Sequence, residues 1–86
     1  MPCNPYIKTI TLVNGADYQP LSNTTLIFTG FIEIPPDAAE VMIKTPAGEY
    51  TRGPGWYCWV DHIDLSKIQA KAYGSDTRLE ISGTAH

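Results

Sequence analysis

The sequence predicts a small all-β domain, a sandwich of about seven short antiparallel strands. Three observations lead to this prediction. Runs rich in β-branched and aromatic residues recur at a spacing of roughly 8 to 12 residues, and each run ends at a cluster of turn-forming residues. No segment beyond a single turn at residues 37–40 favours a helix. The 86 residues, with seven glycines and seven prolines spread along them, make one domain, 1–86, with a thin core.

The first half of the chain contains two predicted strands. Residues 6–13 are β-branched and end at an Asn-Gly turn. Residues 16–23 have weak periodicity and are interpreted as a connection, with a short edge strand around Tyr18 as the alternative. Residues 24–34 alternate apolar and mixed positions, and Pro35 stops them because proline cannot donate to a strand ladder. Gly30 inside this run predicts a bulge or a closely approaching backbone.

The second half contains five predicted strands. Pro46 lies in a type I turn that makes a hairpin of the first two, and the glycines at 53 and 55 separate that hairpin from a tryptophan-rich strand. The last strand has the clearest two-residue period, with Leu79 and Ile81 facing inward. The five runs are residues 40–44, 49–52, 56–65, 68–73 and 77–82.

Charge and composition exclude several classes of partner. The net charge is −3, the pI is about 5.1, and the six basic residues are scattered, so a nucleic-acid surface is not expected. No apolar run approaches the roughly 18 residues of a membrane span, and residues 1–5 lack the features of a signal peptide. We therefore expect a cytosolic chain in which Cys3 and Cys58 stay reduced, with a disulfide between them as the less favoured alternative.

The tryptophan-rich strand has apolar residues on both faces. Strict alternation places four apolar residues, Tyr57, Trp59, Ile63 and Leu65, on one face with Asp61. This face has more apolar members than the other, and we expect Trp59, Ile63 and Leu65 to point into the core. The opposite face holds Trp56, Cys58 and Val60, which are then left without a cover inside the domain. A partner protein is the cover that this pattern favours.

No catalytic, metal-binding or cofactor-binding residues are expected. Four residues along a strand separate Cys58 from His62 by roughly 13 Å, too far for proton transfer. Strict alternation also turns Asp61 away from His62 and Asp64, so a shared metal ion is disfavoured. The aromatic residues leave two interpretations open, a core or subunit interface and a sugar-binding platform; they are Tyr50, Trp56, Tyr57 and Trp59.

The order of several short motifs resembles the immunoglobulin-like repeat domains of bacterial surface proteins and of bacteriophage structural proteins. These motifs are Phe28-Thr29-Gly30, the Val-containing run 41–44, Gly55-Trp56, Asp64-Leu65-Ser66 and the Ala-rich run 69–73. The resemblance implies an immunoglobulin-like β-sandwich. As a single module that begins with methionine and lacks an export signal, the chain is similar to the small accessory proteins of phage capsids and tails.

These observations lead to the hypothesis of a non-enzymatic module that binds another protein. Trp56, Tyr57 and Val60 are the predicted contact residues, with Arg52 as a hydrogen-bonding partner at the rim. The resemblance implies a decoration or tail component of a virion, assembled in the host cytoplasm on capsid or tail subunits, and a homo-oligomer is left open. The alternative is a carbohydrate-binding or adhesive module at the cell surface.

Overall fold

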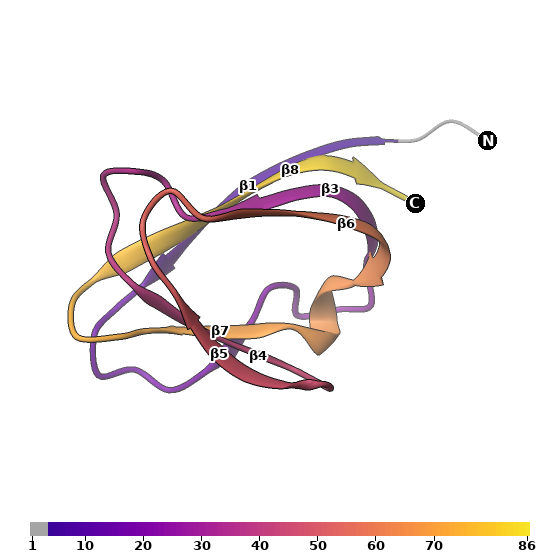
Figure 1. The fold of residues 1–86 in the computed structure, drawn as a ribbon. Helices are drawn as coiled ribbons and strands as arrows, with labels where there is room; N and C mark the ends of the chain where they lie inside the picture. The colour runs from indigo at the N-terminus through magenta and orange to yellow at the C-terminus, as the bar shows by residue number, and fades with distance from the viewer. Residues whose placement is uncertain (1–3) are drawn as a thin grey trace.

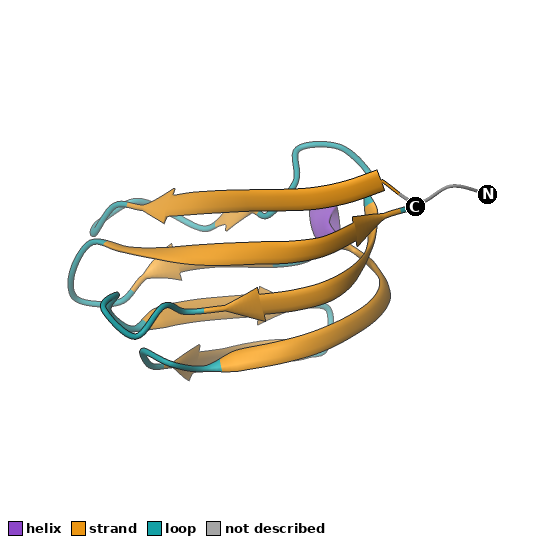
Figure 2. Cartoon of the chain, turned by 90° about the horizontal axis from the view of Figure 1, so that it is seen from above, coloured by secondary structure: helices purple, strands orange, loops and turns teal. Residues whose placement is uncertain are grey.

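A computed structural model describes residues 4–86, which fold into two four-stranded antiparallel sheets packed face to face (Figures 1 and 2). The first sheet has the strand order β1-β8-β3-β6 and the second has the order β2-β7-β4-β5. A single turn of 3-10 helix, η1 (Leu65–Lys67), joins the two sheets between β6 and β7. The strands are β1 (Asn4–Leu12), β2 (Gln19–Pro20), β3 (Ile27–Glu33), β4 (Val41–Thr45), β5 (Gly48–Arg52), β6 (Tyr57–Asp64), β7 (Gln69–Ala72) and β8 (Thr77–Ala85).

The strands pair as one long hairpin that has been rolled up. β1 pairs with β8, β2 with β7, β3 with β6, and β4 with β5, so each strand of the first half meets its counterpart from the second half. Folding this hairpin over makes the two sheets of a jelly roll. Asn4 pairs with Ala85, and Figure 1 shows the start of β1 and the end of β8 at the same end of the first sheet.

The predicted all-β sandwich is confirmed, with eight strands where about seven were expected. The additional strand, β2, is two residues long and lies in the segment interpreted as a connection. The arrangement of the strands differs from the one that the resemblance implied, because a constant-type immunoglobulin sandwich has sheets of four and three strands and this one has two sheets of four.

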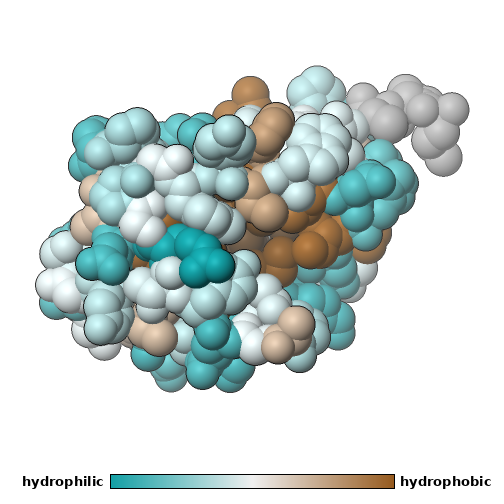
Figure 3. Space-filling model, in the orientation of Figure 1, coloured by the Kyte–Doolittle hydropathy of each residue, from teal (hydrophilic) through white to brown (hydrophobic). Residues whose placement is uncertain are grey.

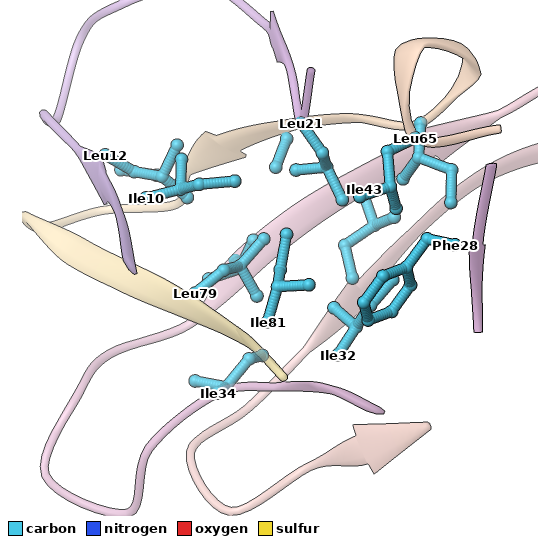
Figure 4. Close-up of a cluster of buried hydrophobic side chains, with 14 residues drawn as sticks. Ile10, Leu12, Leu21, Phe28, Ile32, Ile34, Ile43, Leu65, Leu79 and Ile81 are labelled. Atoms are coloured by element: carbon cyan, nitrogen blue, oxygen red, sulfur yellow. The ribbon is translucent and has the colours of Figure 1, made fainter. Parts of the chain in front are cut away.

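The core lies between the sheets and is built by alternation along each strand. Leu79 and Ile81 of β8 are fully buried, which confirms the inward face predicted for the last strand. Figure 4 shows the inward side chains of both sheets meeting around Phe28 and Ile43. The buried hydrophobic set is Ile10, Leu12, Leu21, Phe28, Ile32, Ile34, Val41, Ile43, Leu65, Ile68, Ala70, Ala72, Leu79 and Ile81.

Two glycines make room for the largest core side chain. Gly30 of β3 and Gly83 of β8 are register partners, and a Cβ built on Gly30 would lie 2.6 Å from the Cα of Gly83 and 2.8 Å from the Cζ of Phe28. The Phe28 ring also makes an edge contact with Tyr6, with ring centroids 5.9 Å apart. The close backbone approach that the sequence predicted at Gly30 is therefore confirmed, together with a register shift between Phe28 and Gly30.

Candidate functional site

A β-bulge in β6 decides which of its side chains point outward. Gly30 pairs with Val60 and Phe28 pairs with Ile63, so two residues of β6, Asp61 and His62, face the single residue between them on β3. His62 has a φ of 50°, in the left-handed region. The extra residue interrupts the alternation, because Asp61 and His62 both lie on the exposed side before Ile63 turns inward again.

The bulge overturns part of the predicted face assignment. Trp56 and Val60 pack against the core and, with Cys58, line the space between the sheets, whereas Trp59 is 58% exposed. The prediction that Trp59 points inward and that Trp56, Cys58 and Val60 point outward is therefore wrong. It assumed a two-residue period along the whole strand, which a bulge does not keep. The predicted inward orientation of Ile63 and Leu65 is confirmed.

The sequence contains a signal for this bulge. If Asp61 and His62 both face outward, all inward side chains of residues 56–65 are apolar. Every charged residue of this segment then faces outward. A burial pattern of this kind favours an extra residue at the Asp-His pair over strict alternation.

Exposed apolar side chains gather on the outer face of the first sheet, the face that Figure 2 views from above. The register aligns Ile7 with Ser82, Ser82 with Phe31, and Phe31 with Trp59, so one row crosses all four strands. Ile7 is 82% exposed and Tyr57, which precedes Trp59 by two positions along β6, is 68% exposed. We call the four residues Ile7, Phe31, Tyr57 and Trp59 the aromatic face.

The three rings of the aromatic face contact one another at steep angles. The ring centroids of Phe31 and Trp59 are 5.1 Å apart with planes at 72°, and those of Phe31 and Tyr57 are 5.9 Å apart with planes at 59°. Beside them lies a shallow depression of about 270 Å³ that is lined by Phe31, Glu33, Tyr57 and Ser82. The outer face of the first sheet thus combines aromatic rings with a carboxylate.

A polar cluster lies where the bulge meets the end of β8. Thr29 Oγ1 donates to Asp61 Oδ1 at 3.0 Å and accepts the backbone N–H of His62 at 3.0 Å, and the Nε2 of His86 lies 2.8 Å from the same hydroxyl. The imidazole of His62 donates to Asp61 at 2.8 Å and stacks on His86 with centroids 4.3 Å apart. These hydrogen bonds, that of His62 first and that of Thr29 second, lower the pKa of Asp61.

This cluster corrects the predicted separation of Asp61 from His62, because the bulge brings the two side chains together. Within residues 4–86, no three histidine, cysteine, aspartate or glutamate side chains are grouped in a way that would hold a metal ion. The stacked imidazoles and the carboxylate form a hydrogen-bonded end of the sheet.

Cys58 lies inside the sandwich, and among residues 4–86 no histidine lines the cavity beside it. Its Sγ contacts the carbonyl of Trp59 at 3.5 Å, and it lines a cavity of about 70 Å³ between the sheets with apolar neighbours such as Ile32 and Ile43. Figure 3 shows apolar atoms, in brown, at the opening of this space between the two sheets. Pairing of Cys58 with Cys3 is a prediction that falls outside the described residues.

Arg52 lies at the end of β5, in the second sheet. Its guanidinium carbon is 4.5 Å from the centre of the Tyr50 ring, and Tyr50 meets Trp56 edge-on with centroids 6.4 Å apart. Burial raises the pKa of the Tyr50 hydroxyl. The four predicted contact residues are therefore divided: Tyr57 lies on the aromatic face, Arg52 lies in the other sheet, and Trp56 and Val60 pack against the core. A contact role for Tyr57 and Arg52 stays a prediction.

Two residues of the aromatic face, Ile7 and Phe31, were missing from the predicted set because they lie on strands far from the tryptophan-rich one in sequence. Comparisons with known protein families, with curated proteins and with solved structures find no match for this chain. Within residues 4–86, no helix has the length and apolar character needed to cross a membrane. A functional proposal therefore rests on the surface chemistry of the sandwich.

Proposed function

We propose that this protein is a non-enzymatic interaction module that binds another protein through the aromatic face. The observation that carries the proposal is the group of exposed apolar side chains on the outer face of the first sheet. Tyr57, Trp59 and Phe31, which are 68%, 58% and 40% exposed, are in ring contact, and Ile7, 82% exposed, lies beyond Ser82. Contiguous apolar patches on a soluble domain mark interaction sites. Aromatic residues are enriched in protein interfaces, and tryptophan and tyrosine dominate their binding energy.

The shape of the aromatic face favours a protein over a sugar. Ile7, the most exposed member, offers only aliphatic surface, and the planes of Tyr57 and Trp59 are tilted from that of Phe31 by 59° and 72°. An uneven surface of aliphatic and aromatic groups suits the interdigitating side chains of a protein interface. Carbohydrate binding is the second candidate, because the Tyr57 and Trp59 rings are exposed enough to stack on a sugar.

As the setting of this interaction we propose a virion, with the chain as a decoration or tail component that is assembled on capsid or tail subunits in the host cytoplasm. Two considerations support it. The short motifs of the sequence resemble those of phage structural proteins, and jelly rolls are used by viral capsid proteins and lectins. The second consideration is an analogy of fold, and fold alone does not define function.

Site-specific photo-crosslinking tests the proposal. Tyr57 is replaced by p-benzoylphenylalanine in the organism that encodes the chain, and Tyr73, an exposed tyrosine in the turn between β7 and β8, is replaced in the matched control. We expect a discrete adduct with one protein from position 57 alone, and a virion subunit in that adduct would support the proposed setting. No adduct, or the same adducts from both positions, contradicts the proposal.

An oligosaccharide titration separates the two candidates. Trp59 is exposed and Trp56 packs against the core, so a sugar that stacks on the aromatic face changes the fluorescence of Trp59. A saturable change that disappears in Trp59→Phe favours carbohydrate binding. A protein adduct at position 57 without any response to oligosaccharides favours the interaction module.

A further inference from the structure

We propose that the partner docks a basic side chain, arginine in particular, beside the aromatic face, where its guanidinium pairs with Glu33 and Glu80. This inference rests on the proposed function and names the chemistry of the partner at that site. It is carried by a pair of carboxylates next to exposed aromatic rings, of which Glu80 is paired with Arg78 and Glu33 has no ion pair within residues 4–86.

Glu33 of β3 and Glu80 of β8 are direct register partners on the outer face of the first sheet. Like charges placed opposite each other destabilise a sheet, so this pair is a local conflict in the fold. Local rules are most often broken at functional sites. A positively charged side chain of a partner would therefore relieve the repulsion between Glu33 and Glu80.

The cations of the chain compensate this pair only in part. Arg78 Nε lies 3.5 Å from Glu80, but its Nη2 is hydrogen-bonded to Asp37 at 2.7 Å. Within residues 4–86, no lysine, arginine or histidine forms an ion pair with Glu33. The chain as a whole carries a net charge of −3, which favours the approach of a basic partner.

The Glu33 carboxylate and the rings of Phe31 and Tyr57 line one depression. Glu33 is the register partner of Tyr57, and Phe31 lies two positions before it on the same strand. The depression that these residues line with Ser82 has a volume of about 270 Å³. This is below the roughly 300 to 1,000 Å³ of small-molecule pockets, so the depression accommodates a single side chain better than a whole ligand.

Arginine fits both parts of this site. Its planar guanidinium stacks on aromatic rings and forms paired hydrogen bonds with carboxylates, whereas lysine offers a point charge. Elsewhere the chain already places its own cations on rings: Arg52 lies over Tyr50, and Lys71 lies 4.7 Å from the centre of the Tyr18 ring. In the described part of the chain, no cation lies over the rings of the aromatic face.

The experiment uses a fluorescein-labelled, capped Gly-Arg-Gly-Arg-Gly peptide and the same peptide with citrulline, a neutral isostere, in place of arginine. Fluorescence anisotropy is measured against the full chain at low ionic strength. We expect the arginine peptide to bind about tenfold more tightly than the citrulline peptide. The preference should shrink as salt is added, because the charges at this surface are exposed to screening.

The variant Glu33→Gln/Glu80→Gln should lose the preference, while Glu49→Gln, an exposed carboxylate of β5 in the other sheet, should keep it. No measurable binding of the arginine peptide, equal binding of the two peptides, or a preference that survives in Glu33→Gln/Glu80→Gln overturns the inference. Circular dichroism confirms that each variant is folded. If the adduct at position 57 persists in Glu33→Gln/Glu80→Gln, the proposed function holds and this inference alone fails.

Discussion

Trp56 and Trp59 lie on opposite faces of the first sheet although they are only three positions apart. Trp56 packs against the core and meets Tyr50 edge-on, whereas Trp59 is 58% exposed and touches Phe31. Trp56→Ala should therefore lower the free energy of unfolding by about 2 to 4 kcal/mol, because it leaves a cavity. Trp59→Ala should cost about 1 kcal/mol or less, the value of an exposed ring contact. Urea unfolding of both variants checks this difference, and equal losses would contradict the face assignment.

Gly83 should not tolerate a side chain. A Cβ at this position would overlap the carbonyl oxygen of Thr29 and lie 2.7 Å from the Cα of Gly30 and 2.9 Å from the Phe28 ring. Gly83→Ala is expected to lower the free energy of unfolding by about 1 to 3 kcal/mol, because two strands and a core ring must shift. The matched control is Gly53→Ala, where no atom lies within 4 Å of the added carbon. Thermal unfolding of the two variants should show a large loss only for Gly83→Ala.

The positive φ of His62 restricts which residues fit the bulge. At a φ of 50° a β-branched side chain is strained, whereas asparagine is one of the residues that adopt the left-handed region most readily. His62→Val is expected to lose about 1 to 2 kcal/mol of stability from this backbone strain. His62→Asn, which removes the same imidazole contacts, is the matched comparison and should be the more stable variant. Similar unfolding midpoints for the two variants would show that the backbone strain is not the deciding cost.

Asp64 links the stability of the sandwich to pH. Its Oδ1 accepts hydrogen bonds from the hydroxyl and backbone N–H of Ser66 and from the N–H of Leu26, and those of Ser66 are the largest cause of its lowered pKa. Because the folded pKa lies below the unfolded value of about 3.9, this stabilisation is present above pH 4 or so and is lost as the pH falls through the folded pKa.

Asp64→Asn should therefore reduce stability at neutral pH and flatten its decline in acid. The control is Glu40→Gln, because the exposed carboxylate of Glu40 accepts no hydrogen bond within residues 4–86. We expect this variant to keep the wild-type urea midpoint at neutral pH and the wild-type decline in acid. Urea midpoints measured from pH 7 to pH 2.5 test both expectations. If the urea midpoint of Asp64→Asn falls in acid as much as that of the wild type, the acid sensitivity belongs to other groups.

The strands could be predicted from the sequence because their signals are local. β-branched runs and turn residues placed β3 and β8 at nearly their observed positions, and Leu79 and Ile81 were predicted inward from alternation alone. The two-residue β2 lies beside the edge strand around Tyr18 that was only the less favoured alternative, because the stretch containing Pro20 has weak periodicity and its pairing with β7 is a distant contact.

The candidate site was harder to predict because it depends on pairing between distant strands. In the bulge Thr29 faces two residues of β6, and the signal for it in the sequence is the burial pattern of residues 56–65, which strict alternation overlooks. Ile7 and Phe31 could not be joined to Tyr57 and Trp59, since the row they form runs through the pairs β1–β8, β8–β3 and β3–β6. Alternation did place Tyr57 and Trp59 on the same face of the strand.

The long-hairpin pairing has a consequence for how the chain folds as it is synthesised. Among the eight strands of residues 4–86, only β4 and β5 are both consecutive in sequence and neighbours in a sheet. At a translation rate of roughly 5 to 20 residues per second, β1 waits several seconds on the ribosome until β8 has been made. During that time the apolar side chains of Ile10 and Leu12 are uncovered. Ribosome-associated chaperones are therefore expected to bind the nascent chain at β1. The first sheet is expected to form only after β8 has emerged from the ribosome and can pair with β1.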